Sequence, residues 1–274
     1  MKTILIPTDF SEVSKNAVEY GILLAKEKNA QVVLLHVFHI PVVATDDPVL
    51  ATSFDQMEED NMTFLKDIES ELRTKYNFTN VIESINKPGF LIDEISEIVK
   101  EKSPDLIVMG ITDAGKLSEL FISSKSIGVI KKINCPVIII PGRARYQKVS
   151  TIVFACDIEK TENISALEKV KEFVQLFDAK LLIFNKVENY EDKEREEPIF
   201  NEKFTALFQD IPHSIHFATG EELVISINAF IDMNNADLLI MIHKKHAFFS
   251  QLFRESNTKK MAFHSHIPLL AIHE

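Results

Sequence analysis

The amino-acid sequence repeats itself once, and this duplication limits the fold more than any other feature. Residues 2–9 (KTILIPTD) correspond to residues 150–157 (STIVFACD), at an offset of 148 positions. Residues 105–109 (DLIVM) correspond to 237–241 (DLLIM), at an offset of 132. The second copy is therefore about 16 residues shorter between its second and third strands. Two long copies predict two similar domains and not a solenoid, which needs three or more short repeats.

Each copy alternates short apolar runs with longer amphipathic stretches. In the first copy the pattern predicts strands at 3–6, 31–37, 80–85, 106–109 and 136–141, helices near 13–25, 54–76, 91–99 and 124–133, and a polar loop at 41–53. Strands that are apolar on both faces and separated by helices are typical of a covered parallel sheet. With right-handed connections, each copy becomes a doubly wound, Rossmann-like α/β domain: a five-stranded parallel sheet with helices on both faces. The expected domains are 1–143 and 149–274, with a short polar joint between them.

Composition excludes several classes of function. The chain has only 7 glycines, six of them in the first copy, which argues against glycine-rich architectures and repeated phosphate loops. The net charge of -11 argues against nucleic-acid and membrane-surface partners. No apolar run approaches the ~18 residues of a membrane span, and the apolar N-terminal stretch is too short for a signal peptide. The 2 cysteines cannot build a disulfide framework, so we expect a cytoplasmic protein.

Acidic residues follow the first strand of each copy. Asp9 and Asp157 stand at the carboxyl edge of the expected sheets, where doubly wound folds bind ligands. Each can bind a base or ribose, or cap the next helix. The acid-rich run 188–197 is expected to be a solvated loop. Phe248, Phe249 and Phe253 can cover a degenerate site or form a partner-binding patch.

Most of the histidines fall in the second copy, several of them in pairs three residues apart. A metal site needs three or four converging ligands, so we expect surface and loop histidines and no metal site. The sequence carries no nucleophile–base signature, and we therefore predict no catalytic residue and no enzyme.

Four motifs of the chain resemble the universal stress protein family in its tandem two-domain form. They are ILIPTDFS (4–11), LHV (35–37), DLIVMG (105–110) and CPVII (135–139), and the resemblance extends over both copies. Members of the family that bind ATP carry a loop Gly-x2-Gly-x9-Gly-(Ser/Thr), whose glycines let the backbone approach the phosphates. The corresponding residues are Gly110, Asp113, Ser123 and Ser124 in the first copy, and Ile242, Lys245, Glu255 and Ser256 in the second.

The resemblance implies a site for ATP or another adenine nucleotide in the first domain only. Its residues would be Pro7, Thr8, Asp9, Val37, Met109, Gly110, Ser123 and Ser124. It also implies that the two domains associate through their last strands, 137–140 and 269–272, as a pseudo-symmetric pair, and that whole chains can form a homodimer.

Three hypotheses for the function follow. The first is a cytoplasmic, non-catalytic stress-response or regulatory protein that acts through protein partners and carries a degenerate ATP-binding motif. The second is a sensor of ATP or AMP that binds through the first domain. The third is an enzyme, either a slow ATPase or a metal-dependent activity of the histidine-rich half.

Overall fold

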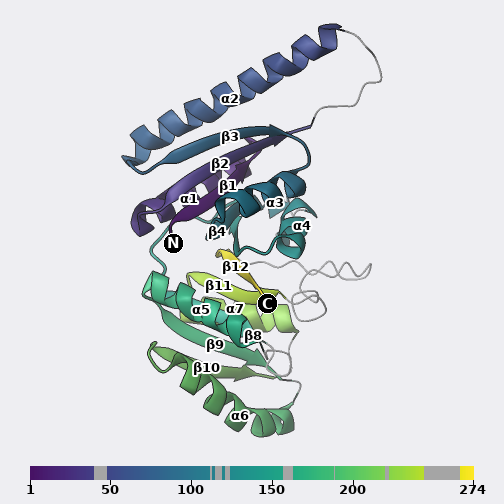
Figure 1. Cartoon of the computed structure of the whole chain (residues 1–274). Coiled ribbons are helices and arrows are strands. Elements are labelled where there is room, and N and C mark those ends of the chain that lie inside the picture. Colours follow the sequence, from purple (N-terminus) through teal and green to yellow (C-terminus); the bar gives the residue numbers. More distant parts are fainter. Residues whose placement is uncertain are drawn as a thin grey trace. The chain divides into compact units, whose positions relative to one another are not determined.

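The computed structural model describes residues 1–39, 48–111, 113–114, 119–120, 124–156, 163–187, 189–219, 222–243 and 266–274. The chain divides into two compact units (Figure 1). The first includes Met1–Ile111 and Ile122–Tyr146, and the second includes Thr112–Phe121 and Gln147–Glu274. Each unit is described by itself below.

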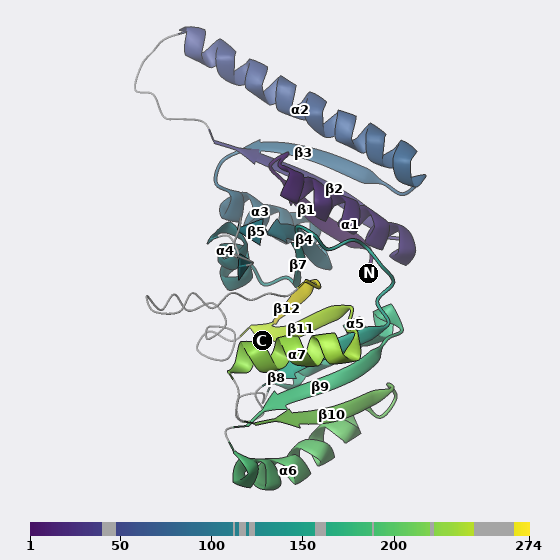
Figure 2. The same cartoon turned by 180° about the vertical axis from the view of Figure 1, so that it is seen from behind.

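The first unit is a parallel sheet of five strands in the order β7-β4-β1-β2-β3. Its strands are β1 (Thr3–Thr8), β2 (Gln31–Phe38), β3 (Ile82–Pro88), β4 (Leu106–Ile111) and β7 (Val137–Pro141). The helices α1 (Glu12–Lys28) and α2 (Pro48–Tyr76) cover one face, and α3 (Leu91–Lys102) and α4 (Ser124–Lys132) cover the other (Figures 1 and 2). Two short strands that belong to the second unit, β5 (Asp113–Ala114) and β6 (Glu119–Leu120), pair antiparallel with each other.

The second unit has the same topology, with the strand order β10-β9-β8-β11-β12. Its strands are β8 (Thr151–Cys156), β9 (Lys180–Lys186), β10 (His213–Ala218), β11 (Leu238–His243) and β12 (Leu269–His273). Its described helices are α5 (Ile164–Phe177), α6 (Tyr190–Phe208) and α7 (Leu223–Asn234). The prediction of two doubly wound α/β domains with five-stranded parallel sheets is confirmed.

The two units use the same local signals where their first helices begin and end. Ser11 and Asn163 are the N-caps of α1 and α5, and each side chain accepts a hydrogen bond from the backbone N–H three residues later. Such caps pair N–H groups that have no partner inside the helix. Asn29 and Asp178 close the same helices in the left-handed conformation.

The first strand of each sheet consists of buried apolar side chains. Ile4, Leu5 and Ile6 of β1 are 0% exposed, as are Ile152, Val153 and Phe154 of β8. Consecutive residues of a strand point to opposite faces, so complete burial of all three means that both faces of the sheet are covered.

A repeated carboxylate contact fastens the first strand of each unit. Asp105 Oδ2, just before β4, accepts hydrogen bonds from the backbone N–H groups of Lys2 and Thr3. Asp237, just before β11, accepts them from the N–H groups of Ser150 and Thr151 and from the Ser150 hydroxyl, at 2.7 to 2.9 Å. In both units, therefore, an aspartate before the fourth strand of the chain order accepts hydrogen bonds from the backbone at the start of the first strand.

The polar segment expected at 41–53 is partly helical. Residues 41–47 lie outside the described residues, but α2 begins at Pro48, six positions before the expected start at Phe54. Proline is well tolerated at the first helical position, because the N–H it lacks would have no partner there and its φ is already helical. Composition alone therefore placed this boundary too late.

The acid-rich run 188–197 was expected to be a loop, and this prediction is wrong from residue 190 onward. Those residues form the first turns of α6. The Asn189 side chain caps the helix by accepting from the N–H of Asp192 at 2.9 Å, and Asp192 forms an ion pair with Arg195 at 3.0 Å. Acidic side chains stabilise the first turn of a helix because the N-terminus of the helix dipole is positive. Near the C-terminus of α6, Phe204 is 0% exposed and packs the helix onto its unit.

No helix in the described parts of the chain combines the length and the apolar character that a bilayer crossing requires.

The acid contacts lead to a prediction about stability. Asp237→Ala removes an acceptor of four hydrogen bonds, so we expect a loss of about 2 kcal/mol in the free energy of unfolding, against about 1 kcal/mol for the more exposed Asp105→Ala, which accepts two. Urea denaturation measures both. Asp67→Ala, on the exposed face of α2, is the control and should change little. Equal values for the three variants would contradict the structural role.

Candidate functional site

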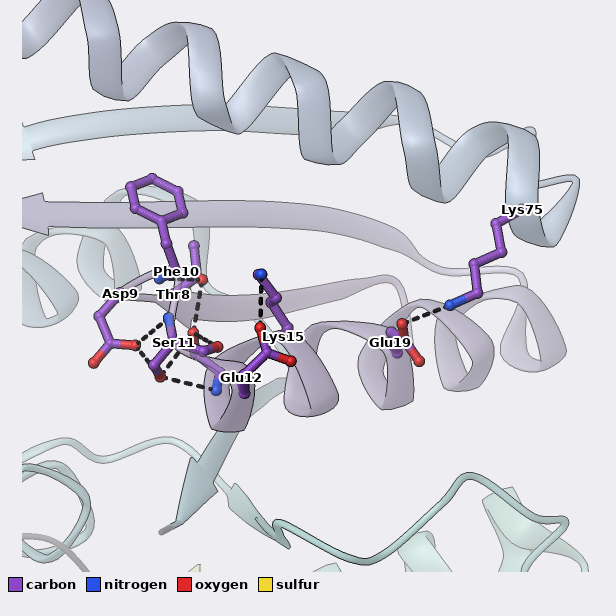
Figure 3. A network of polar contacts seen from close by, with 9 residues as sticks. Thr8, Asp9, Phe10, Ser11, Glu12, Lys15, Glu19 and Lys75 are labelled. Carbon is purple, nitrogen blue, oxygen red and sulfur yellow. Dashed lines mark hydrogen bonds and ion pairs between the residues drawn. The ribbon is translucent and has the colours of Figure 1, made fainter.

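A network of short polar side chains lies at the carboxyl end of β1, where Asp9 follows the strand (Figure 3). Asp9 Oδ1 accepts hydrogen bonds from the Ser11 hydroxyl at 2.6 Å and from the Ser11 backbone N–H at 3.2 Å. Thr8 Oγ1 and Ser14 Oγ share a buried hydrogen bond of 3.1 Å. The cap of α1 is Ser11 and not Asp9, and the Asp9 side chain is exposed at the edge of the sheet.

Asp9 is held in its ionised form. Burial raises the pKa of the Asp9 carboxyl, but hydrogen bonds from Ser11 and Ser14 and the positive charge of Lys125 outweigh it and lower the pKa below its ordinary value. Lys125 is the second residue of α4. The N-terminus of α4 therefore acts on the same edge of the sheet as Asp9.

Phe10 has a backbone conformation that aromatic residues rarely adopt. Its φ is 64°, in the left-handed region, where a bulky side chain is strained. The ring stacks on the His36 imidazole with centroids 4.2 Å apart and lies 5.8 Å from the Phe64 ring of α2. The strained turn therefore places the Phe10 ring against His36 at the carboxyl end of the sheet.

A row of three polar residues crosses β1, β2 and β3 beneath this turn. Thr8 is the register partner of His36, and His36 is the register partner of Asn86. All three are at most 9% exposed. Asn86 donates from Nδ2 to the Glu58 carbonyl at 3.1 Å, whereas its buried Oδ1 has no hydrogen-bond partner among the described residues. This oxygen can accept a donor from a ligand or from water.

His36 lies within the strand expected at 31–37, and the structure buries its imidazole there. Its Nδ1 lies 2.8 Å from the Thr8 carbonyl oxygen, which only accepts, so Nδ1 carries the proton. Burial lowers the pKa of His36 and outweighs the effects of the Thr8 carbonyl and of Asp9, which raise it. The sequence signal was the position of His36 inside an apolar strand. His36, Asn86, Phe10 and Phe64 were all missing from the predicted site.

The remaining predicted site residues are placed differently from one another. Pro7, Thr8 and Met109 are buried in β1 and β4, and Val37 is partly exposed near the end of β2. Ser124 is the first residue of α4. Ser123 lies outside the described residues.

Gly110 has a packing role that the sequence did not reveal. A Cβ atom at this position would lie 2.6 Å from the carbonyl oxygen of Val13 in α1 and 2.8 Å from its Cγ1. The absence of a side chain therefore allows α1 to approach β4. This role is independent of any phosphate group.

A groove of about 340 Å³ lies between α1 and α2 and reaches Thr8. Its lining carries charges of both signs: Glu12 is paired with Lys15 at 2.8 Å and Glu19 with Lys75 of α2 at 2.7 Å (Figure 3), and Glu71 and Arg145 also line it. Because these charges compensate one another, the groove offers little attraction to an anionic ligand.

The same edge of the second unit carries different side chains. The register partners are Cys156 and Asn185, followed by Phe217, in place of Thr8, His36 and Asn86. Asp157 lies outside the described residues, as do Lys245, His246, Phe248, Phe249, Phe253, Glu255 and Ser256. Ile242, at the position of Gly110, is 8% exposed. The second unit therefore lacks the polar row of the first.

Comparisons with known proteins agree with this fold. The model of the universal stress protein family matches residues 1–141. Universal stress protein MJ0531 of Methanocaldococcus jannaschii is 31% identical over 144 residues, which cover 51% of this chain and 81% of that protein. Universal stress protein MJ0577 of the same organism is 27% identical over 152 residues, covering 51% and 94% of the two chains. The crystal structure of a universal stress protein from Archaeoglobus fulgidus superposes with a TM-score of 0.74 at 21% identity, over 99% of this chain and 98% of that one.

The contact at Gly110 predicts a large cost for a small substitution. Gly110→Ala should lower the free energy of unfolding by about 1–3 kcal/mol, because the new methyl group meets backbone atoms of α1. Gly21→Ala is the matched control. Its Cβ would meet side-chain atoms of Ile6 and Val108 and no backbone atom, and alanine favours the helix. Thermal or urea denaturation gives both values, and equal losses would contradict the assignment.

The buried imidazole predicts a dependence of stability on pH. Because the pKa of His36 is lowered in the folded protein, the unfolded chain takes up a proton first as the pH falls through about 6.5. Stability should therefore fall from pH 7.5 to pH 5.5, and His36→Asn should reduce this slope. Asparagine is the residue that the second unit has at the aligned position.

His216→Asn is the comparison in the second unit, where burial also lowers the pKa of a histidine. It should remove a separate share of the slope. Urea denaturation of each variant at pH 7.5 and pH 5.5 measures the change in the free energy of unfolding. If this change is the same in His36→Asn as in the wild type, the pKa of His36 does not differ between the folded and unfolded states.

Proposed function

Because the chain belongs to the universal stress protein family, we propose that it is a non-catalytic stress-response protein of the cytoplasm whose first unit alone binds an adenine nucleotide. Nucleotide binding in the first unit would then regulate contacts with protein partners. The proposal treats 1–143 and 149–274 as two domains of the same family, the second with a degenerate nucleotide loop. Both cysteines are buried thiols, which agrees with a reducing compartment.

The difference between the two sheet edges supports the proposal most strongly. At the end of β1 the first unit has Thr8 and an ionised Asp9, with the positive charge of Lys125 nearby. At the end of β8 the second unit has the thiol of Cys156, and its neighbour on β9 is Asn185. Doubly wound folds bind ligands at this edge, and among the described residues the first unit presents the groups better suited to a nucleotide.

The residues of the first unit fit the nucleoside end of the ligand better than its phosphates. An ionised Asp9 can accept hydrogen bonds from ribose hydroxyls, and Pro7 and Val37 border the base in the site that the family resemblance implies. Ser124 and Lys125 stand at the N-terminus of α4, where backbone N–H groups favour an anion. Gly110, however, faces Val13, and Asp113 would repel a triphosphate. We therefore expect AMP to bind at least as tightly as ATP.

Nucleotide titration tests this function. In isothermal titration calorimetry, the purified chain should bind AMP, ADP or ATP with one site per chain. Asp9→Asn keeps the acceptor for Ser11 but removes the charge, and should weaken the affinity about tenfold or more. Asp157→Asn, at the aligned position of the second copy, is the matched control and should leave the affinity unchanged.

Three results would contradict the proposal. They are the absence of binding and of thermal stabilisation at millimolar nucleotide, a stoichiometry of two, and equal effects of the two variants. Mass spectrometry of the supernatant from denatured protein adds an independent check, because it reports nucleotide carried through purification.

The pairing of the two domains through their last strands, 137–140 with 269–272, remains a prediction of the family resemblance. The homodimer also remains a prediction. Light scattering of the purified chain measures its mass in solution and so tests the homodimer.

A further inference from the structure

Two histidines stand side by side at the carboxyl edge of the second sheet. His243 ends β11 and His273 ends β12, and the two residues are register partners in the parallel ladder. Their ring centroids are 5.7 Å apart, and the rings meet edge to face at 81°. Both residues are partly exposed, although the Nδ1 atom of each ring is buried.

The duplication shows that the fold does not require this pair. The corresponding register partners of the first unit are Ile111 and Pro141, which end β4 and β7. Two apolar residues therefore close the equivalent strands there. The second unit has imidazoles in their place, although the rest of β11, Leu238–Ile242, is apolar and buried.

The pair also lies where the topology favours ligands. The chain leaves β8 toward β9 and β10 on one side, and it places β11 and β12 on the other. Strand order thus reverses between β8 and β11, and open α/β sheets bind ligands outside the carboxyl ends at this point. His243 is the last residue of β11, beside the switch point.

We propose that His243 and His273 form a two-imidazole site for a divalent transition-metal cation of the Cu²⁺, Ni²⁺ and Zn²⁺ class. Imidazole nitrogen suits these ions, with bonds of about 2.0–2.1 Å. Two imidazoles on one ion have ring centroids no more than roughly 6.5 Å apart. The observed 5.7 Å lies within this limit, so the two rings are close enough to share one ion.

The remaining coordination positions would be open. The described residues contain no group of three or more His, Cys, Asp or Glu side chains that could hold a metal ion. Water or a small anion therefore completes the shell. A site with two neutral nitrogen ligands should follow the order Cu²⁺ above Ni²⁺ and Zn²⁺, and should discriminate against Mg²⁺ and Ca²⁺, which prefer oxygen.

Titration of the full chain with each metal chloride tests the site. Calorimetry should show one Cu²⁺ and one Zn²⁺ site per chain, with copper bound more tightly, and no heat from Mg²⁺. His243→Gln and His273→Gln should each weaken Zn²⁺ binding ~10-fold or more, because each removes one of two ligands. His266→Gln is the matched control, since this exposed histidine of the same unit lies before β12, and its affinity should stay within about twofold of the wild type.

A second readout locates the ion. Added Cu²⁺ should broaden the imidazole NMR signals of His243 and His273 before those of His213 and His216. Circular dichroism checks that both glutamine variants are folded, and the broadening experiment on the wild-type chain does not depend on them.

The proposal is overturned if the wild type binds neither Cu²⁺ nor Zn²⁺ at millimolar metal. It is also overturned if both glutamine variants bind like the wild type, or if other histidines broaden first. Because the site is in the unit for which no nucleotide is proposed, its failure leaves the nucleotide hypothesis intact. The reverse also holds.

Discussion

Burial of both faces of the parallel sheets is the constraint on which the other features of this protein depend. Strands such as β1 and β8 have apolar side chains on both faces, so polar groups can gather only where the strands end. In a parallel sheet all carboxyl ends meet at one edge. The acids, hydroxyls and imidazoles of each unit are therefore collected at that edge by the backbone itself. Asp105 and Asp237 secure the opposite ends of the same strands.

The two copies share the buried parallel sheet and differ in the side chains at its carboxyl edge. The first has a polar row, Thr8–His36–Asn86, under the strained Phe10 turn and beside an ionised Asp9. The second replaces the row with a thiol, an amide and an aromatic ring, and places imidazoles at the ends of β11 and β12. Residues inside the sheets are constrained by packing, whereas residues at its edge are free to diverge. Duplication thus gives one chain two chemically distinct edges.

Much of the fold was predictable because its signals are local. Apolar runs and helical spacing placed the strands and most helices, and the repeat predicted a second domain of the same topology. The errors fall where local composition is misleading. Pro48 begins α2 inside a polar segment, and the acids of α6 are stabilised by a cap, the helix dipole and the burial of Phe204. Composition does not report such tertiary support, so both segments were predicted as loops.

The sequence by itself determined the duplication, the doubly wound topology and the position of Asp9 after a buried strand, because periodicity and repeated motifs are properties of neighbouring residues. Only the tertiary structure decided which distant residues meet. Register brought His36 beside Asn86 and His243 beside His273, although the members of each pair lie far apart in the sequence. It also gave Gly110 its role against Val13. The strand register and the distance between α1 and β4 result from the packing of the whole unit. The order of residues along the chain does not specify them.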